Sequence, residues 1–407
     1  MRVLVAFHDE SMGGTSRSAL AFAETWKDAG AHVKLYCPSS PHSARLRQLW
    51  QMGVEVTNDL SDIGLFTPDL LHIHHGAPSG ATTTWVSRLL SYCEDFAPAV
   101  LTHDIFGQGL GRTIEKGLRS QGTRSHVVGL LGDWLATQHS AQYGSLSHVR
   151  RIIPNPQDFS FFRRPTSTER LDARAARQIL PNEKVILRIG SPIAEKWTLA
   201  GYLKLAECVA NTPNYRLRLI GAPRKLVDAL PALPRIEVLQ TIADDEVLRA
   251  EYWAADVFMH WADRGESFGN VILEALGCGL PVAYRSREFR DNTPWEFQSL
   301  SGFSYASNTD HWLTMARRLG RDSFTVSAAD ATGLEKYGQE QLRSRLSYIV
   351  SEVDAVGNRL DAGAIVKILQ QGFREPVGLP KTHRWRVALR HNPVAASAKF
   401  LKHRFRL

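Results

Sequence analysis

The chain has 407 residues, of which 43% are hydrophobic and 22% charged, a length that favours two globular domains over one. No run of eighteen apolar residues offers a membrane span, and the four cysteines are too scattered for a disulfide framework or a cysteine zinc site. Residues 381–407 hold eight of the 49 Lys and Arg residues and no acid, so the net charge of +8 belongs to this tail. The remaining chain balances 41 basic against 41 acidic side chains, which disfavours a nucleic-acid groove across its body.

Short apolar segments alternate with helical periodicity through the first half of the chain, and this alternation predicts parallel βαβ units. Helices are expected over Ser18–Ala29 and Trp85–Cys93, among others. The expected strands cover 2–7, 32–37, 70–74, 98–102 and 126–130. Because the first strand follows Met1 directly, we expect no signal peptide and a cytoplasmic protein.

Two glycines, Gly13 and Gly14, precede the first predicted helix in the run Ser11–Arg17. They could let backbone amides approach a diphosphate or an acceptor, although an ordinary tight turn is the alternative. The Gly-x-Gly-x-x-Gly fingerprint is absent after this strand, and the second predicted strand does not end in a clear acidic residue. A nicotinamide-dependent enzyme is therefore disfavoured.

Histidines gather at the ends of two predicted strands. Alternation along 70–74 places His72 and His74 on one face and His75 on the other, so a common metal site is disfavoured and the three are interpreted as core and strand-end residues. His103 follows the apolar segment 98–102, at the carboxyl end where open α/β sheets bind their ligands. It is a candidate active-site residue, with capping of the strand end as the alternative.

A second series of strands begins after the polar stretch Arg163–Arg177, which is interpreted as a linker. These strands are predicted at 184–190, 216–220, 236–239, 256–260 and 281–284. Two Rossmann-like halves follow from this repetition, and helical periodicity over Leu334–Val353 and Ala362–Gln371 supplies closing helices.

The run Gly265–Ala283 predicts a loop, a short helix, a stop and a strand in that order. Asn270 is a suitable N-cap, Gly279 suits the left-handed position after the helix, and Pro281 prevents its continuation. Free amides from Gly269 to Val271 would favour a phosphate beyond the helix start.

Two carboxylates, Glu266 and Glu274, are separated by seven residues in the same run and cannot form a tight acid pair. Carboxylate oxygens near a phosphate site suit vicinal sugar hydroxyls, which suggests a nucleotide sugar. The pattern Glu-x-seven-Glu followed by Ala-Leu-Gly-Cys-Gly-Leu-Pro-Val resembles the signature of family-4 retaining glycosyltransferases. The resemblance implies the GT-B fold, an α/β architecture in which two Rossmann-like domains face each other across a cleft.

The resemblance also divides the chain. Residues 1–160 correspond to an N-terminal acceptor domain and 161–372 to a nucleotide-sugar domain, with last helices that cross back to the first domain. Residues 373–407 form a basic tail. Arg151–Asp158 resembles the family's hinge, with Pro156 in place of the usual glycine.

Individual roles are implied in the same way. Glu266 would reach the donor sugar, Glu274 would hold the ribose hydroxyls, and His103 would act near the sugar as a hydrogen-bond donor. Lys196 matches a diphosphate-binding lysine, but Ser191 stands where an arginine is usual and Trp197 where a glycine is usual. One phosphate cation is then either missing or supplied by Arg188 or Arg264. The expected donor-binding residues are Gly14, Arg188, Arg264, Gly269, Asn270, Val271 and Glu274.

With this resemblance, the sequence predicts a metal-independent hexosyltransferase without a cofactor, which moves a sugar from a nucleoside diphosphate sugar to a glycan or glycolipid hydroxyl in bacterial-type polysaccharide or glycolipid synthesis. The resemblance implies that the transfer retains the anomeric configuration. A nucleotide-sugar-binding protein without transferase activity is the alternative. Apolar residues at helical spacing in 394–407, flanked by Lys and Arg, predict peripheral contact with an anionic membrane surface through 381–407. A disordered extension and a helix packed on the first domain compete with that interpretation.

Overall fold

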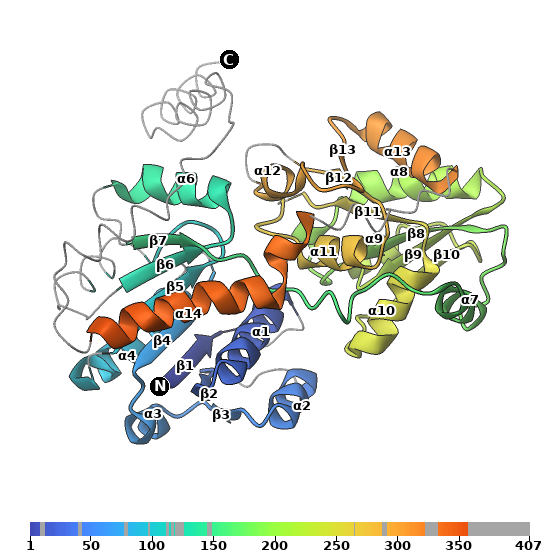
Figure 1. The fold of residues 1–407 in the computed structure, drawn as a ribbon. Coiled ribbons are helices and arrows are strands. Elements are labelled where there is room, and N and C mark those ends of the chain that lie inside the picture. Colours follow the sequence, from blue (N-terminus) through green and yellow to red (C-terminus); the bar gives the residue numbers. More distant parts are fainter. Residues whose placement is uncertain are drawn as a thin grey trace, which may run out of the picture.

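The computed structural model has two lobes, each built around one parallel sheet (Figure 1). The structure describes the chain from Met1 to Val356 except for 9–12, 40–42, 77–79, 97, 111–113, 115–117, 119–125, 145–148, 264, 287–290 and 322–332. The basic tail and the predicted helix at 362–371 therefore lie outside the described residues, as does Arg264.

The first sheet has seven strands in the order β3-β2-β1-β4-β5-β6-β7, all parallel. Its strands are β1 (Arg2–Phe7), β2 (His32–Tyr36), β3 (Glu55–Thr57), β4 (Leu70–His75), β5 (Ala99–Asp104), β6 (His126–Leu130) and β7 (Val149–Ile152). The associated helices are α1 (Gly14–Asp28), α2 (Ser43–Gln51), α3 (Leu60–Phe66), α4 (Gly80–Tyr92), the short η1 (Glu94–Phe96) and α6 (Asp133–Tyr143). Every residue of β4 and β5 is buried, as expected for central parallel strands covered on both faces.

The second sheet has six parallel strands in the order β10-β9-β8-β11-β12-β13. They are β8 (Lys184–Ile189), β9 (Tyr215–Ile220), β10 (Ile236–Leu239), β11 (Val257–Trp261), β12 (Val282–Arg285) and β13 (Phe303–Tyr305). The helices of this half are α7 (Ser167–Ala175), η3 (Ala194–Lys196), α8 (Leu199–Ala210), α9 (Arg224–Val227), α10 (Asp245–Ala254), α11 (Asn270–Gly277), α12 (Thr293–Phe297) and α13 (Thr309–Arg321).

Ten predicted strands occur within one or two residues of their expected bounds, and three further strands were missed. Two of the missed strands, β3 and β13, span only three residues each, too short for an alternating pattern to stand out. The third, β7, contains the start of the segment interpreted as a hinge.

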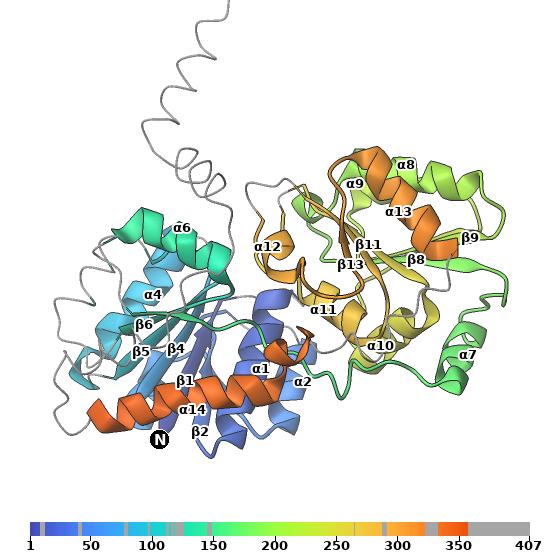
Figure 2. The same cartoon turned by 45° about the horizontal axis from the view of Figure 1, so that its top comes forward.

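The chain returns to the first lobe after the second sheet is complete. A single turn, η5 (Glu335–Tyr337), leads into α14 (Gln339–Val356), which lies along the first lobe beside α1 in both views (Figures 1 and 2). Leu342, Leu346 and Ile349 join the apolar cluster that contains Val3 and Val5 of β1. The core of the first lobe is therefore completed by residues from the far end of the described chain. Among the described residues, none of the helices is long and apolar enough to cross a bilayer.

Candidate active site

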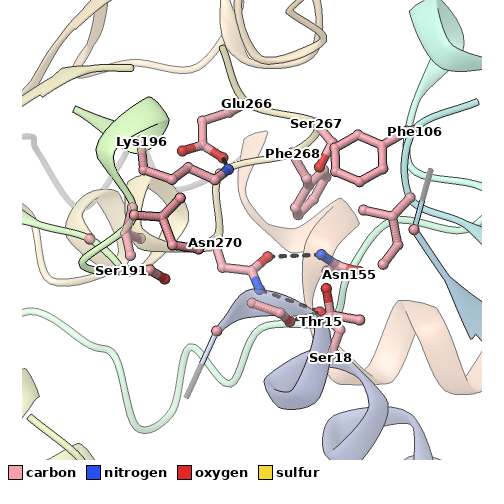
Figure 3. A pocket seen from close by; sticks show the side chains of 18 of the residues that line it. Thr15, Ser18, Phe106, Asn155, Ser191, Lys196, Glu266, Ser267, Phe268 and Asn270 are labelled. Carbon is pink, nitrogen blue, oxygen red and sulfur yellow. Dashed lines mark hydrogen bonds and ion pairs between the residues drawn. The ribbon is translucent and has the colours of Figure 1, made fainter. Parts of the chain in front are cut away.

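The helix α11 begins at the boundary between the two lobes. Gly269 precedes it with φ 88°, a left-handed conformation that favours glycine, and caps it without a side-chain hydrogen bond. Asn270 is thus the first helical residue and not the predicted N-cap. Its side chain instead faces the first lobe, where Asn155 Nδ2 donates to Asn270 Oδ1 at 3.0 Å and Asn270 Nδ2 donates to Ser18 Oγ at 3.4 Å (Figure 3). The sequence could not show this, because both partners are distant in the chain.

The other end of α11 agrees with prediction. Gly279 has φ 76°, and the amide of Leu280 donates to the carbonyl of Ala275 at 2.9 Å, a Schellman arrangement. Pro281 follows and β12 starts at Val282. The helix is therefore fixed at both ends, so its start is held at a constant position relative to the sheet.

A cavity of about 470 Å³ lies between the lobes and meets the start of α11. Its second-lobe wall includes Lys196, Glu266 and the backbone from Gly269 to Val271. The first lobe contributes Gly14 and the strand-end residues His74 and His75, among others. Among the described residues, the amides of Asn270 and Val271 make no backbone hydrogen bond, so the helix start offers donors and a positive dipole end to this space.

Glu266 and Lys196 point toward each other and are in contact on the second-lobe wall of this cavity (Figure 3). Lys196 Nζ lies 2.6 Å from Glu266 Oε2, and His260 Nε2 lies 3.3 Å from Glu266 Oε1. Burial by itself would raise the pKa of Glu266, but the Lys196 ammonium and the nearby imidazole outweigh it and bring the pKa well below its usual range. Burial lowers the pKa of His260 to about 4. Glu266 is thus a carboxylate beside a neutral imidazole at neutral pH.

Glu274 lies one turn inside α11 and is fully buried. Tyr252 donates its hydroxyl to Glu274 Oε2 at 2.8 Å, and Arg17 of the first lobe places Nη1 3.1 Å from Glu274 Oε1. A second contact joins Arg17 Nη2 to Asp245 Oδ1 at 2.6 Å. Arg17 was not identified from the sequence as a site residue. Its position in the first turn of α1, just after Gly13 and Gly14, is the one sequence feature that could have indicated it.

A second cavity of about 340 Å³ adjoins Glu274. Its lining from the first lobe consists of Gly13, Gly14, Arg17 and Arg45. The second lobe contributes glycine and polar residues (Gly190, Ser191, Thr241, Asp245, Asn270 and Glu274) and apolar residues (Ile189, Pro192, Ile193, Ile220, Ile242, Leu248 and Val271). Apolar side chains next to a buried carboxylate suit a nucleoside, whose base is apolar on its faces and whose ribose carries a diol.

Arg188 is buried and directed inward. Its Nε donates to the Tyr202 hydroxyl at 2.9 Å, its Nη2 donates to the carbonyl of Lys196 at 2.9 Å, and its guanidinium carbon lies 4.7 Å from the centre of the Trp197 ring. Trp197 Nε1 in turn donates to the carbonyl of Ser191 at 2.8 Å. Arg188 and Trp197 therefore support the loop that carries Lys196 from beneath. Arg188 also borders the larger cavity.

His103 is buried behind the cavity wall and does not line either cavity, so the direct role expected for it near the sugar has no support in this arrangement. Its Nε2 lies 2.9 Å from the carbonyl of Ile153 at the end of β7, and its ring packs against His74, 4.8 Å away between ring centres. Burial lowers the pKa of His103 to about 3. The register between β4 and β5 explains this placement, because His74 and His103 are paired across the two strands.

His72, His74 and His103 bring ring nitrogens within 4.8 Å of one another, a grouping that alternation along one strand did not reveal. The tautomers argue against a metal. Trp26 Nε1 donates to His72 Nδ1 at 3.0 Å, so the proton of neutral His72 resides on Nε2, the nitrogen that would have to bind the ion. His103 Nε2 lies next to a carbonyl oxygen, which can only accept, so the proton of neutral His103 resides on Nε2. These three residues fit a neutral, buried cluster of packed rings better than a metal centre.

Comparisons with known proteins agree with this fold. Residues 183–291, from the start of the second sheet through α11 and β12, match the family model described as "Glycosyl transferases group 1". No curated protein matches the sequence of this chain.

Solved structures show the same fold over most of the chain. HepE of Anabaena in complex with UDP and glucose has a TM-score of 0.66 at 14% identity and covers 86% of this chain and 100% of its own. A glycosyltransferase from Rickettsia africae has a TM-score of 0.68 at 12% identity, with 86% and 98% covered. WaaG, a glycosyltransferase involved in lipopolysaccharide biosynthesis, has a TM-score of 0.56 at 14% identity, with 88% and 100% covered.

Proposed function

We propose that this chain, which has the GT-B fold and a group 1 glycosyltransferase region over residues 183–291, transfers a sugar from a nucleoside diphosphate sugar to a hydroxyl acceptor. One observation carries the proposal. Glu266, Lys196, the free amides at the start of α11 and the buried Glu274 converge on adjoining cavities between the two lobes. Glu266 suits a sugar, Lys196 and the amides suit a diphosphate, and Glu274 suits a ribose.

The geometry supports a specific placement of the donor. Its ribose diol would bind Glu274 with the base against Ile242, and its diphosphate would lie between Lys196 and the amides of Asn270 and Val271. The main barrier in such a transfer is departure of the diphosphate, and these donors face the negative charge that develops on it. Preorganised donors of this kind contribute on the order of 3–4 kcal/mol each in enclosed sites.

Glu266 would then contact the donor sugar. Lys196 already neutralises its carboxylate, so a bound diphosphate would share that ammonium with Glu266. This arrangement links sugar recognition to departure of the diphosphate, because one cation touches both groups. The acceptor would enter from the first lobe, past His74 and His75.

Several finer features belong to the same proposal and rest on the resemblance of the Glu-x-seven-Glu run. We expect retention of anomeric configuration, a hexosyl donor, no cofactor and no metal requirement, and a role in bacterial-type polysaccharide or glycolipid synthesis. UDP-sugars are the first donors to try, since the HepE structure holds UDP and glucose. A nucleotide-sugar-binding protein without transferase activity is the second candidate, and Ser191 at the expected arginine position favours it.

Release of the nucleoside diphosphate from candidate donors tests the proposal. A transferase releases UDP, GDP or ADP from one of its sugars when an acceptor is present, whereas a pure binding protein is stabilised by the donor against heat but never releases the diphosphate. EDTA should leave the rate unchanged, because Lys196 and backbone amides neutralise the diphosphate. Complete loss of activity with EDTA, restored by Mg²⁺ or Mn²⁺, would contradict the metal-independent placement.

A further inference from the structure

We propose that Arg17, from the first lobe, supplies the second cation for the donor diphosphate, in the place where Ser191 leaves the second lobe without one. The inference rests on the proposed function and adds a residue to the same site. It makes diphosphate binding a contact between the two lobes and not a property of the second lobe alone.

The second lobe offers few cations at this position. Ser191 lies in the loop between β8 and η3 and lines both cavities, but its side chain carries no charge. The neighbouring Arg188 is committed to the Tyr202 hydroxyl and to backbone carbonyls. Turning it outward would break its hydrogen bond to that hydroxyl and would leave the carbonyl of Lys196 without its Arg188 donor, and an unsatisfied buried group costs about 1–3 kcal/mol. Lys196 therefore remains the available second-lobe cation among the residues that the structure describes here.

Arg17 borders the same cavity as Ser191. It rises from the first turn of α1, directly after Gly13 and Gly14, and its side chain keeps 20% of its surface exposed. One face of the guanidinium lies 5.1 Å from the centre of the Phe162 ring, which leaves its N–H edges for polar partners. A planar guanidinium with five N–H donors binds phosphate oxygens in pairs, which a lysine cannot do.

A nucleotide would replace one of the two present partners of Arg17. Glu274 Oε1 faces Arg17, whereas Glu274 Oε2 is held by Tyr252. A ribose diol that binds Glu274 competes with Arg17 for Oε1. Asp245, at 2.6 Å, keeps the other edge of the guanidinium near the cavity. Arg17 can therefore exchange one carboxylate for a phosphate while it remains anchored by the other.

The test compares a nucleoside with its diphosphate. Wild-type protein, full length, is titrated with UDP, GDP and ADP to find the diphosphate that binds most tightly, and then with the matching nucleoside. In Arg17→Gln, the diphosphate should bind at least about tenfold more weakly while the nucleoside keeps its affinity, because a charge-assisted hydrogen bond is lost only where a phosphate is present. Arg17→Lys should keep part of the preference for the diphosphate, because lysine retains the positive charge but lacks the paired N–H donors of the guanidinium.

Asp245→Asn is the matched control. It removes the charge that anchors Arg17 but leaves the Arg17 cation, so the ratio of nucleoside to diphosphate dissociation constants should fall by clearly less than in Arg17→Gln. An unchanged ratio in Arg17→Gln, or an equal fall in Asp245→Asn, would show that Arg17 only holds the lobes together and would overturn the inference. Failure of wild-type protein to bind any of the three diphosphates would overturn the proposed function itself.

Discussion

Glu266 and Glu274 are close in the chain and occupy different electrostatic surroundings. Glu266 faces the larger cavity beside an ammonium and a neutral imidazole, and Glu274 is enclosed between a tyrosine hydroxyl and an arginine. We therefore expect the two carboxylates, seven residues apart on a loop and a helix, to contact different parts of one elongated ligand.

Replacement of each carboxylate should separate these roles. Glu274→Gln should weaken binding of the sugar-free nucleoside diphosphate by about tenfold or more, because a hydrogen bond to a charged acceptor contributes about 1.5–3 kcal/mol. Glu266→Gln should leave that affinity within about threefold of wild type and should lower turnover of the donor sugar. Calorimetry with the diphosphate and a turnover assay measure the two effects. Equal losses of diphosphate affinity in both variants would contradict the division.

Buried histidines make stability depend on pH. Burial lowers the pKa of His103 to about 3 and that of His260 to about 4, and it brings the pKa values of His72 and His74 well below the usual range. Unfolded histidine has a pKa near 6.5, so the unfolded state takes up protons first as the pH falls. The stability that these neutral rings contribute is present above that value and is lost progressively below it.

Three acids oppose this trend, since burial raises the pKa of Asp291 to about 6 and also raises the pKa values of Glu24 and Glu296. The four histidines outnumber these acids, so we expect the free energy of unfolding to fall between pH 7 and pH 5, by up to about 1.4 kcal/mol per pH unit for each histidine. Urea unfolding at several pH values measures the slope. His103→Asn should reduce the slope, whereas His311→Asn, at an exposed position, should leave it unchanged. A slope that is the same in all three proteins would contradict this origin.

At the scale of the element, α11 carries positive-φ glycines on both sides. A Cβ on Gly269 would lie 2.8 Å from Ile272 Cδ1, and one on Gly279 would lie 3.2 Å from Arg164 Cγ. Gly269→Ala and Gly279→Ala should each destabilise the protein by about 1–2 kcal/mol, the cost of a left-handed conformation for a residue with Cβ.

Only one of the pair should affect binding, because Gly269 lies at the start of the helix and Gly279 at its far end. Gly269→Ala should weaken the nucleoside diphosphate at least several-fold, and Gly279→Ala should not, once both are measured well below their melting temperatures. Thermal unfolding and calorimetry give the two quantities. Equal binding losses would mean that general destabilisation, and not the helix start, explains the effect.

The helix α11 also shows which features can be predicted from the sequence and which cannot. The end of α11 was predictable because Gly279 and Pro281 act on their own backbone. The start was only half predictable: the free amides follow from local geometry, but the side chain of Asn270 is taken by Asn155 and Ser18, which the chain brings in from 115 and 252 residues away. Arg17 and the His74–His103 pair were missed for the same reason, since each depends on contacts between distant segments.

At the scale of the whole molecule, the basic tail remains a prediction, since residues 381–407 lie outside the described part. We expect full-length protein to sediment with anionic vesicles and much less with neutral ones, because basic residues near an anionic surface contribute about 1 kcal/mol each. A protein that ends at residue 380 should lose this binding and keep its affinity for the diphosphate. Equal sedimentation of the two proteins, or binding of full-length protein to neither vesicle, would contradict the membrane contact.

The return of α14 to the first lobe has a consequence for how the protein is made on the ribosome. The first sheet is complete in sequence at Ile152, yet Leu342, Leu346 and Ile349 cover part of its core. Synthesis proceeds at about 5–20 residues per second, so roughly 200 residues of further translation leave that apolar face uncovered for about 10–40 seconds. The nascent first lobe is thus a natural client for chaperones that bind exposed apolar surface, and a ribosome stalled before residue 339 would display a lobe that cannot finish folding.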